Sequence, residues 1–361
     1  MSVVVPTVSP LLRGLREQAP RQIQRVPPPE DAARWHALQI GSRHYRVALP
    51  VTFTPYASVQ PCSARCGFCS ENLRQHGAGP AAAQLRPGAD YFRQLDAALQ
   101  RLHGVPLSYS LSGLEMTDDP DWLQRLLQTL SASSHGPQVE QRVLYSNGAG
   151  LARSAGATLV DALVAFELSW VELSRHHPQQ AVNDAIMRFR AGEPVADTAV
   201  FEQTARRIAA RLPVRLVCIV QRQGVDSAEQ VQRYLHWAQR CGAEQVIFRE
   251  LARLDGEYRS NATLRYIEQR RIGMDALLEA CMQQPWWRDW TVCASTEGYY
   301  FWNVRLRSAS GMEVVFESAD YAAMHRRHAS GEVYKLVFFA NGRLCAGWNP
   351  QADVLWEPAD G

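Results

Sequence analysis

Three cysteines lie close together in the segment Pro61-Cys62-Ser63-Ala64-Arg65-Cys66-Gly67-Phe68-Cys69. Because the chain has only 8 cysteines in 361 residues, random placement would give this spacing roughly 0.004 times per chain. Thiolates are soft ligands that suit iron–sulfur clusters and zinc. A four-iron cluster held by three cysteines keeps one iron without a protein ligand, so that a small molecule can bind it and accept an electron. The segment therefore predicts a metal centre and favours a redox cluster.

Structural zinc is the alternative for this segment, with His76 as the fourth ligand. Structural zinc sites usually combine two short cysteine or histidine pairs, and no second cysteine pair is present. The other five cysteines are scattered along a long chain, which is not the pattern of a disulfide scaffold. Because Cys281, Cys293 and Cys345 are isolated from one another, we expect a single cluster. A zinc-stabilised α/β binding protein remains the non-enzymatic alternative.

The elements that must position the cysteines alternate regularly between strand and helix. Apolar and alternating segments predict six strands, at residues 45–54, 107–111, 143–146, 170–174, 214–220 and 246–251. Amphipathic helices separate most of them, and Asp119 with Pro120 is a typical helix start. Such alternation is typical of parallel βαβ units with right-handed crossovers. The cysteine loop follows the first strand, at the strand end where α/β active sites lie.

We therefore expect the α/β class, with a partial (β/α)6 TIM-like barrel of parallel strands. The predicted divisions are an N-terminal extension at 1–44, the barrel at 45–255 and an α+β C-terminal cap at 256–361. In the last of these we expect one helix at 261–282 and strands at 299–306, 312–316 and 333–338. Aromatic residues gather there and could stack on a substrate or pack between strands; they are Tyr299, Tyr300, Phe301, Trp302, Tyr334 and Trp348.

The cysteine spacing Cys-x3-Cys-x2-Cys, with aromatic Phe68 before the third cysteine, resembles the signature of the radical S-adenosylmethionine (SAM) superfamily. The resemblance extends, in the family's motif order, over residues 47 to 251. It implies that Cys62, Cys66 and Cys69 hold a [4Fe-4S] cluster, and that SAM is the second cofactor. It also implies cofactor-binding roles for Phe68, for residues that end the following strands and for an arginine after the fourth strand: Ser112, Gly113, Leu114, Glu115, Asn147, Ser174 and Arg188.

These implied roles differ in detail. Ser112–Glu115 is similar to the family's Gly-Gly-Glu motif, which pairs with the SAM amino group, although Leu114 stands where the family has a small residue. Ser174 would meet the ribose or the carboxylate. Arg188 would bind the carboxylate through its bidentate geometry, with Arg190 as a substitute; a solvated surface arginine is the alternative.

Other polar residues keep open roles. His176 and His177 begin a loop, where a surface or substrate-side role is favoured over metal ligation. Arg249 and Glu250 end the sixth strand and either touch a ligand or form a salt bridge. Cys345 is a buried structural cysteine or a donor of a hydrogen atom. No catalytic residue is assigned.

Composition excludes other classes of function. The formal net charge of +2 is too small to attract nucleic acid or an anionic membrane strongly. No apolar run reaches the length of a membrane helix. Without a secretory signal pattern, we expect a cytoplasmic protein with an electron donor such as flavodoxin or ferredoxin as its partner.

The resemblance implies reductive cleavage of SAM to a 5′-deoxyadenosyl radical that removes hydrogen from a small molecule, a sugar, nucleoside or amino-acid derivative, in the biosynthesis of a specialised metabolite. A peptide-modifying radical SAM maturase is the alternative enzyme, and SAM cleavage to a 3-amino-3-carboxypropyl product is another.

Overall fold

One large sheet organises the computed structural model, which describes residues 10–26, 31–73, 85–133, 136–256, 258, 260–351 and 353–358. Its centre consists of six parallel strands in sequence order, and the predicted strands correspond to them. They are β3 (Arg43–Tyr56), β4 (Pro106–Leu111), β5 (Gln138–Ser146), β6 (Trp170–Ser174), β7 (Val214–Val220) and β8 (Gln245–Glu250). The α/β class with parallel strands is thus confirmed.

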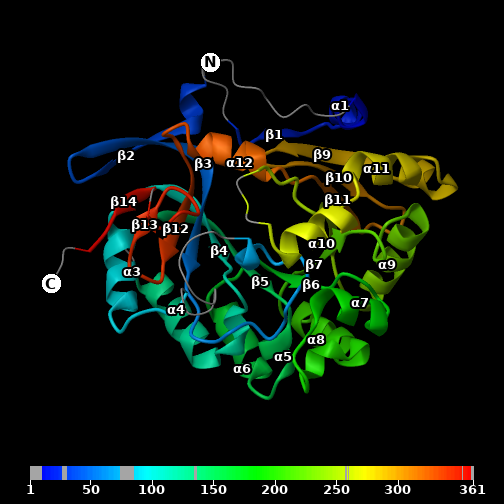
Figure 1. Ribbon diagram of the computed structural model, residues 1–361, viewed down its shortest axis with the longest axis horizontal. Helices are drawn as coiled ribbons and strands as arrows, with labels where there is room; N and C mark the ends of the chain where they lie inside the picture. Colours follow the sequence, from blue (N-terminus) through cyan, green and yellow to red (C-terminus); the bar gives the residue numbers. More distant parts are fainter. Residues whose placement is uncertain are drawn as a thin grey trace.

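Helices cover the outer face of this curved sheet, as Figure 1 shows. Several begin at a side chain that accepts a hydrogen bond from a free backbone N–H of the first turn: Asp119 for α4, Asp197 for α8 and Ser227 for α9. The helices that follow the central strands are α3 (Tyr91–Gln100), α4 (Pro120–Ala132), α5 (Ala149–Ala152), α6 (Gly156–Ala165), α7 (Gln180–Met187), α8 (Thr198–Ala209) and α9 (Ala228–Arg240).

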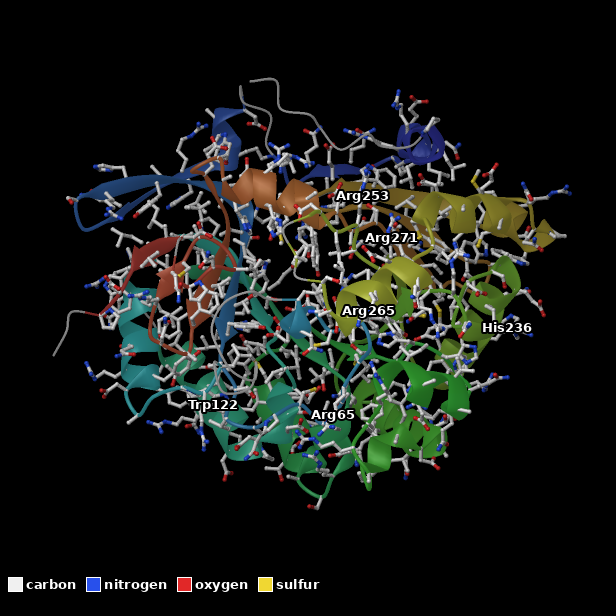
Figure 2. The ribbon with its side chains drawn as sticks, in the orientation of Figure 1. Arg65, Trp122, His236, Arg253, Arg265 and Arg271 are labelled. Carbon is white, nitrogen blue, oxygen red and sulfur yellow. The ribbon has the colours of Figure 1, made fainter. Side chains whose placement is uncertain are left out.

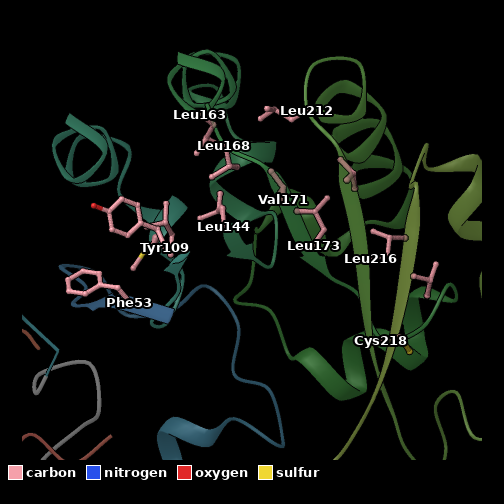
Figure 3. Close-up of a cluster of buried hydrophobic side chains, with 14 of the residues drawn as sticks. Phe53, Tyr109, Leu144, Leu163, Leu168, Val171, Leu173, Leu212, Leu216 and Cys218 are labelled. Carbon is pink, nitrogen blue, oxygen red and sulfur yellow. The ribbon is translucent and has the colours of Figure 1, made fainter. Parts of the chain in front are cut away.

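The main hydrophobic core lies between the sheet and these helices. Alternate residues of each strand point to opposite faces, and the outward set is apolar. Leu144, Leu173 and Leu216 come from three neighbouring strands and are fully buried with Leu163 of α6 (Figure 3). The inward set is more polar and includes Tyr145, Glu172, Ser174 and Arg249. The inner face of the sheet can therefore hold a polar cavity.

The C-terminal strands extend both edges of the same sheet. β11 (Glu313–Glu317) lies parallel to β8, and β9 (Thr291–Glu297) and β10 (Trp302–Arg307) continue antiparallel beyond it. At the other edge, β12 (Val333–Phe339) lies parallel to β3. β13 (Leu344–Cys345) and β14 (Val354–Trp356) follow it. The sheet is open, with β1 and β14 at its two ends.

The prediction of one continuous helix at 261–282 is wrong. It is two helices, α10 (Ala262–Arg270) and α11 (Met274–Met282). Arg271 has extended backbone angles, and Gly273, the residue before α11, is extended as well. Glycine weakens a helix interior, so the break falls beside it. A further helix, α12 (Tyr321–His328), had no prediction.

The N-terminal segment contains ordered elements that its sequence pattern did not indicate. They are α1 (Pro10–Gln18), β1 (Gln22–Gln24) and β2 (Trp35–Ile40). α1 buries Leu12 and Leu15, and its Arg16 binds Glu297 of β9 at 3.1 Å. β1 pairs with β9, while β2 pairs with β3. The predicted boundaries at residues 44 and 255 stay predictions.

Short 3-10 helices complete the described elements, at Ala32–Arg34, Ser70–Asn72, Met116–Asp118, Pro194–Ala196 and Pro285–Asp289. Among the helices of the described residues, none combines the length and the hydropathy needed to cross a membrane.

Candidate active site

The cysteine loop follows β3 and is held against the end of α7. Arg65 donates its backbone N–H to the carbonyl oxygen of Met187 at 2.9 Å, and Gly67 donates to Ile186 at 3.1 Å. In the other direction, the N–H of Arg190 donates to Ser63 at 2.9 Å. These bonds fix the backbone of the loop between its first and third cysteines. α7, which the sequence did not predict, is therefore part of the framework of the site.

All three cysteines of the loop line one cavity of about 990 Å³ on the inner side of the sheet. Burial raises the pKa of the Cys66 thiol to about 12, and the neighbouring Cys69 thiol adds to this effect. Cys66 likewise helps to raise the pKa of Cys62, after burial and the charge of Glu115. The Cys66 thiol thus has the Cys62 and Cys69 thiols as neighbours. Metal ligation requires thiolates, so binding releases their protons.

A single ion site is not formed by the described side chains, since no three or more His, Cys, Asp or Glu residues in that part of the chain converge around one point. His76, the predicted fourth ligand of a zinc ion, lies outside the described residues. Of the other cysteines, none lines the cavity. Cys345 is fully buried in the packing beneath Tyr56, away from the cavity wall.

Glu115 ties the second strand end to the third. Its carboxylate, in a residue only 2% exposed, accepts hydrogen bonds from the Ser146 hydroxyl at 2.8 Å and the Asn147 backbone N–H at 2.5 Å. It also accepts the hydroxyl of Thr117 at 2.5 Å. Burial, together with the charge of Asp118, raises the pKa of Glu115 to about 7.

Asn147 connects the hydrogen bonds of Glu115 to the cysteine loop. Its amide donates to the Ser63 hydroxyl at 3.0 Å and lies 3.7 Å from the sulfur of Cys62. Asp118 accepts the backbone N–H of Ser63 at 2.7 Å, and Arg153 binds Asp118 at 2.9 Å. Glu115 and Asn147, both predicted site residues, therefore position the loop as well as lining the cavity.

The Ser112–Glu115 segment has an unusual backbone. Gly113 has φ +128°, and Leu114 has φ +51°, a left-handed conformation that is uncommon for a leucine. A Cβ on Gly113 would approach the Tyr56 ring to 3.1 Å. This turn faces the cavity with Ser112, Gly113, Leu114 and Glu115.

Phe68 and Ser174 also line the cavity. The Phe68 ring meets the ring of His176 edge to face, with 5.0 Å between centroids. Nδ1 of His176 accepts the backbone N–H of Ile219 at 3.0 Å. Burial, aided by the charge of Arg175, lowers the pKa of His176 to about 3. His176 is therefore a neutral imidazole that carries its proton on Nε2 and forms part of the cavity wall.

Arg188 is the predicted residue that the structure does not bring into the cavity wall. It ends α7 with φ +51° and is exposed. Its charge lowers the pKa of Cys66, against the larger effect of burial. Arg190 donates to the carbonyl oxygen of Pro61 at 2.8 Å, at the start of the cysteine loop. Both arginines thus lie beside the loop and outside the cavity lining.

The residues at the end of β8 do not pair with each other. Arg249 binds Glu317 of β11 at 2.5 Å, whereas Glu250 binds Arg271, which Figure 2 shows after α10. Burial raises the pKa of Glu250 to about 7, against the effect of Arg271. Both residues line the cavity. Each also forms a salt bridge, one of the two expected alternatives, with a residue of another segment.

The outer part of the cavity contains residues that the sequence did not single out. They come from the segment after β8 and from α12: Tyr258, Tyr321, Met324, His325 and His328. Of the aromatic residues predicted there, Tyr300 and Trp348 line the cavity, whereas Trp302 is buried in the core. The segment after β8 and α12 are more than 60 residues apart along the chain, as the contact between Tyr258 and His325 shows, so no sequence motif joins them.

Comparisons with known proteins give remote structural likenesses. No protein-family model and no curated protein matches the chain. SuiB of Streptococcus suis, solved with SAM bound, matches 82% of the chain with a TM-score of 0.46 and 16% identity. SuiB bound to its precursor peptide SuiA matches 82% of the chain with a TM-score of 0.48 and 14% identity. The protein anSMEcpe, solved with SAM and the peptide Cp18Cys, matches 59% of the chain with a TM-score of 0.43 and 15% identity.

The chain spans about 60% of the length of SuiB and 53% of that of anSMEcpe. SAM is bound in the SuiB and anSMEcpe structures just described.

Proposed function

We propose that this protein is a radical SAM enzyme with one [4Fe-4S] cluster, which acts on a small molecule bound in the outer part of the cavity. The observation that carries the proposal is the position of Cys62, Cys66 and Cys69, which line the same cavity as the Ser112–Glu115 turn and Ser174. Three thiols on one loop are a donor set that fits a cluster with one iron facing the cavity.

Cys62, Cys66 and Cys69 would hold the cluster, which would supply the electron for reductive cleavage of SAM. The protein's own residues orient the reactants. Bonds from residues 186–190 fix the cysteine loop, and Glu115 with Asn147 holds the strand ends beside it. The turn at Gly113 and Leu114 presents backbone groups to the same space, where they can bind the amino group of SAM.

The outer wall excludes water from a reactive intermediate and contacts the substrate. It is rich in aromatic and histidine side chains, which suit a compact substrate with a ring or hydrogen-bonding groups. A sugar, nucleoside or amino-acid derivative has these properties, and we propose that its conversion belongs to the biosynthesis of a specialised metabolite. We further propose a cytoplasmic location and reduction by a flavodoxin or ferredoxin.

Iron content tests the donor set. After anaerobic reconstitution with iron and sulfide, we expect about four irons per wild-type chain and near-complete loss of iron in a variant with Cys62, Cys66 and Cys69 all changed to Ala. Replacing Cys241, Cys281 and Cys293 by Ala is the matched control and should leave the iron content unchanged. Stoichiometric zinc that excludes iron from the wild-type protein would contradict the proposal.

A further inference from the structure

The outer wall of the cavity brings together three residues that no part of the proposed cofactor site uses. The segment after β8 runs beside the residues that precede α12. The backbone N–H of Arg253 donates to Ala319 at 2.8 Å, and the N–H of Tyr321 donates to Arg253 at 3.0 Å. Arg253, labelled in Figure 2, thus joins the two segments. This pairing sets Asp255 and Tyr258 against His325 of α12.

The three side chains form a continuous hydrogen-bonded chain. Nδ1 of His325 lies 3.0 Å from a carboxylate oxygen of Asp255, and Nε2 lies 3.2 Å from the hydroxyl of Tyr258. An ionised carboxylate only accepts hydrogen bonds, so Nδ1 carries the proton. In the neutral imidazole, Nε2 must then accept the Tyr258 O–H.

The chain ends at the cavity. Tyr258 and His325 line it, and Asp255 lies behind them. The side chains of Asp255 and His325 keep only 24% and 27% of their accessible surface. The Tyr258 ring also packs at a tilt against two other rings, with its centroid 5.5 Å from that of His325 and 6.4 Å from that of Tyr321. A carboxylate, an imidazole and a hydroxyl in this order have the logic of a catalytic triad with tyrosine at its end.

We propose that Asp255, His325 and Tyr258 form a proton relay whose terminal hydroxyl exchanges a proton with the substrate. The Tyr258 oxygen takes a proton from a substrate O–H or N–H while its own proton passes to Nε2 of His325. Asp255 stabilises the resulting imidazolium. No electron is transferred, and the substrate is left as its conjugate base. The reverse transfer restores the relay.

The relay narrows the class of substrate. Removal of hydrogen from a carbon that bears a hydroxyl or amino group makes the attached O–H or N–H more acidic, and a base beside it can then remove that proton. We therefore infer a substrate with a hydroxyl or amine on or next to the carbon that loses hydrogen. This catalytic role rests on the proposed function, whereas the basicity of the relay itself does not.

Reaction with phenylmethanesulfonyl fluoride tests the relay without knowledge of the substrate. The Tyr258 oxygen displaces fluoride to form a sulfonate ester, and the hydroxyl proton passes to His325. In the reconstituted wild-type protein, peptide mapping by mass should show labelling of Tyr258 at least about tenfold faster than of Tyr300 and Tyr321, as general-base assistance predicts.

Three variants separate the relay from its surroundings. His325→Gln keeps a hydrogen-bonding side chain but no base, and should slow the labelling of Tyr258 at least about tenfold. Asp255→Asn should slow it by a smaller factor. His236→Gln, on the exposed side of α9 (Figure 2), is the matched control and should leave the rate unchanged. Thermal melting verifies that each variant is folded.

Equal labelling of Tyr258 in folded His325→Gln and wild-type protein would overturn the relay, as would slow labelling of wild-type Tyr258. SAM cleavage is measured on the same wild-type preparation. If wild-type Tyr258 is labelled slowly while SAM is cleaved, the relay alone is refuted. If Tyr258 is labelled fast and in a His325-dependent way while SAM is not cleaved, the proposed function is refuted and the relay stands.

Discussion

Replacing Glu115 by alanine is expected to weaken the retention of iron by roughly 10- to 100-fold, the effect of losing a residue that orients metal ligands. The carboxylate accepts the Ser146 hydroxyl, the Asn147 N–H and the Thr117 hydroxyl. Without it these buried donors have no acceptor, which costs about 2–4 kcal/mol of unfolding free energy. Asn147 then loses the orientation that it needs to hold Ser63 beside Cys62.

Iron content after reconstitution and gel filtration, together with urea unfolding, measures both effects. Glu229→Ala is a suitable control, because the Glu229 side chain is 74% exposed and its ion pair with Arg233 lies on the surface of α9. It should lower the unfolding free energy by less than about 0.5 kcal/mol. Wild-type iron retention by the Glu115 variant would show that the network does not support the loop.

The close contact between α5 and the turn after β4 makes Gly150 intolerant of any side chain. A Cβ at this position would lie 1.7 Å from the carbonyl oxygen of Thr117 and 2.3 Å from its carbonyl carbon. Both are backbone atoms, so rotation of a side chain cannot relieve the clash. Gly150→Ala should therefore lower the unfolding free energy by at least about 3 kcal/mol or prevent folding, and thermal melting measures it.

Gly14→Ala is the matched control for this substitution. Gly14 lies within α1, and a Cβ there meets no atom within 4 Å. Because alanine favours a helix over glycine by about 1 kcal/mol, this variant should be as stable as the wild type or slightly more stable. If Gly150→Ala melted within about 2 °C of the wild type, the tight packing of α5 on the 115–118 turn would be wrong.

The sequence predicted the central strands well, because apolar runs and alternation within a few residues are enough to indicate a strand. The apolar run at 214–220 and the segment 170–174 coincide with β7 and β6. Asp119 caps the helix that it was expected to begin. The strand pattern before the three cysteines placed their loop at a strand end, and in the structure all three line a cavity.

Other features depend on contacts between distant segments. β11 and β12 add parallel to opposite edges of the sheet, a choice that no local periodicity encodes. α7 is short, and its role is visible only in its hydrogen bonds to the cysteine loop. The resemblance implied that Arg188 binds SAM, with a surface arginine as the alternative, and the left-handed end of α7 leaves it exposed beside the loop.

The outer wall of the cavity shows the same limit. His325 and Asp255 are 70 residues apart, and neither lies in a recognisable motif. Only the pairing of residue 253 with residues 319–321 brings them into contact. Aromatic residues near 300 were predicted as a group, yet Tyr300 lines the cavity whereas Trp302, at the start of β10, is buried in the core.

Cleavage of SAM tests the central claim most directly. The reconstituted wild-type protein is incubated anaerobically with SAM and dithionite, and the products are separated by chromatography. We predict slow formation of 5′-deoxyadenosine by the wild type and none by Cys66→Ala. Formation of 5′-methylthioadenosine instead, or equal 5′-deoxyadenosine formation by the two proteins, would contradict radical SAM chemistry at this cysteine loop.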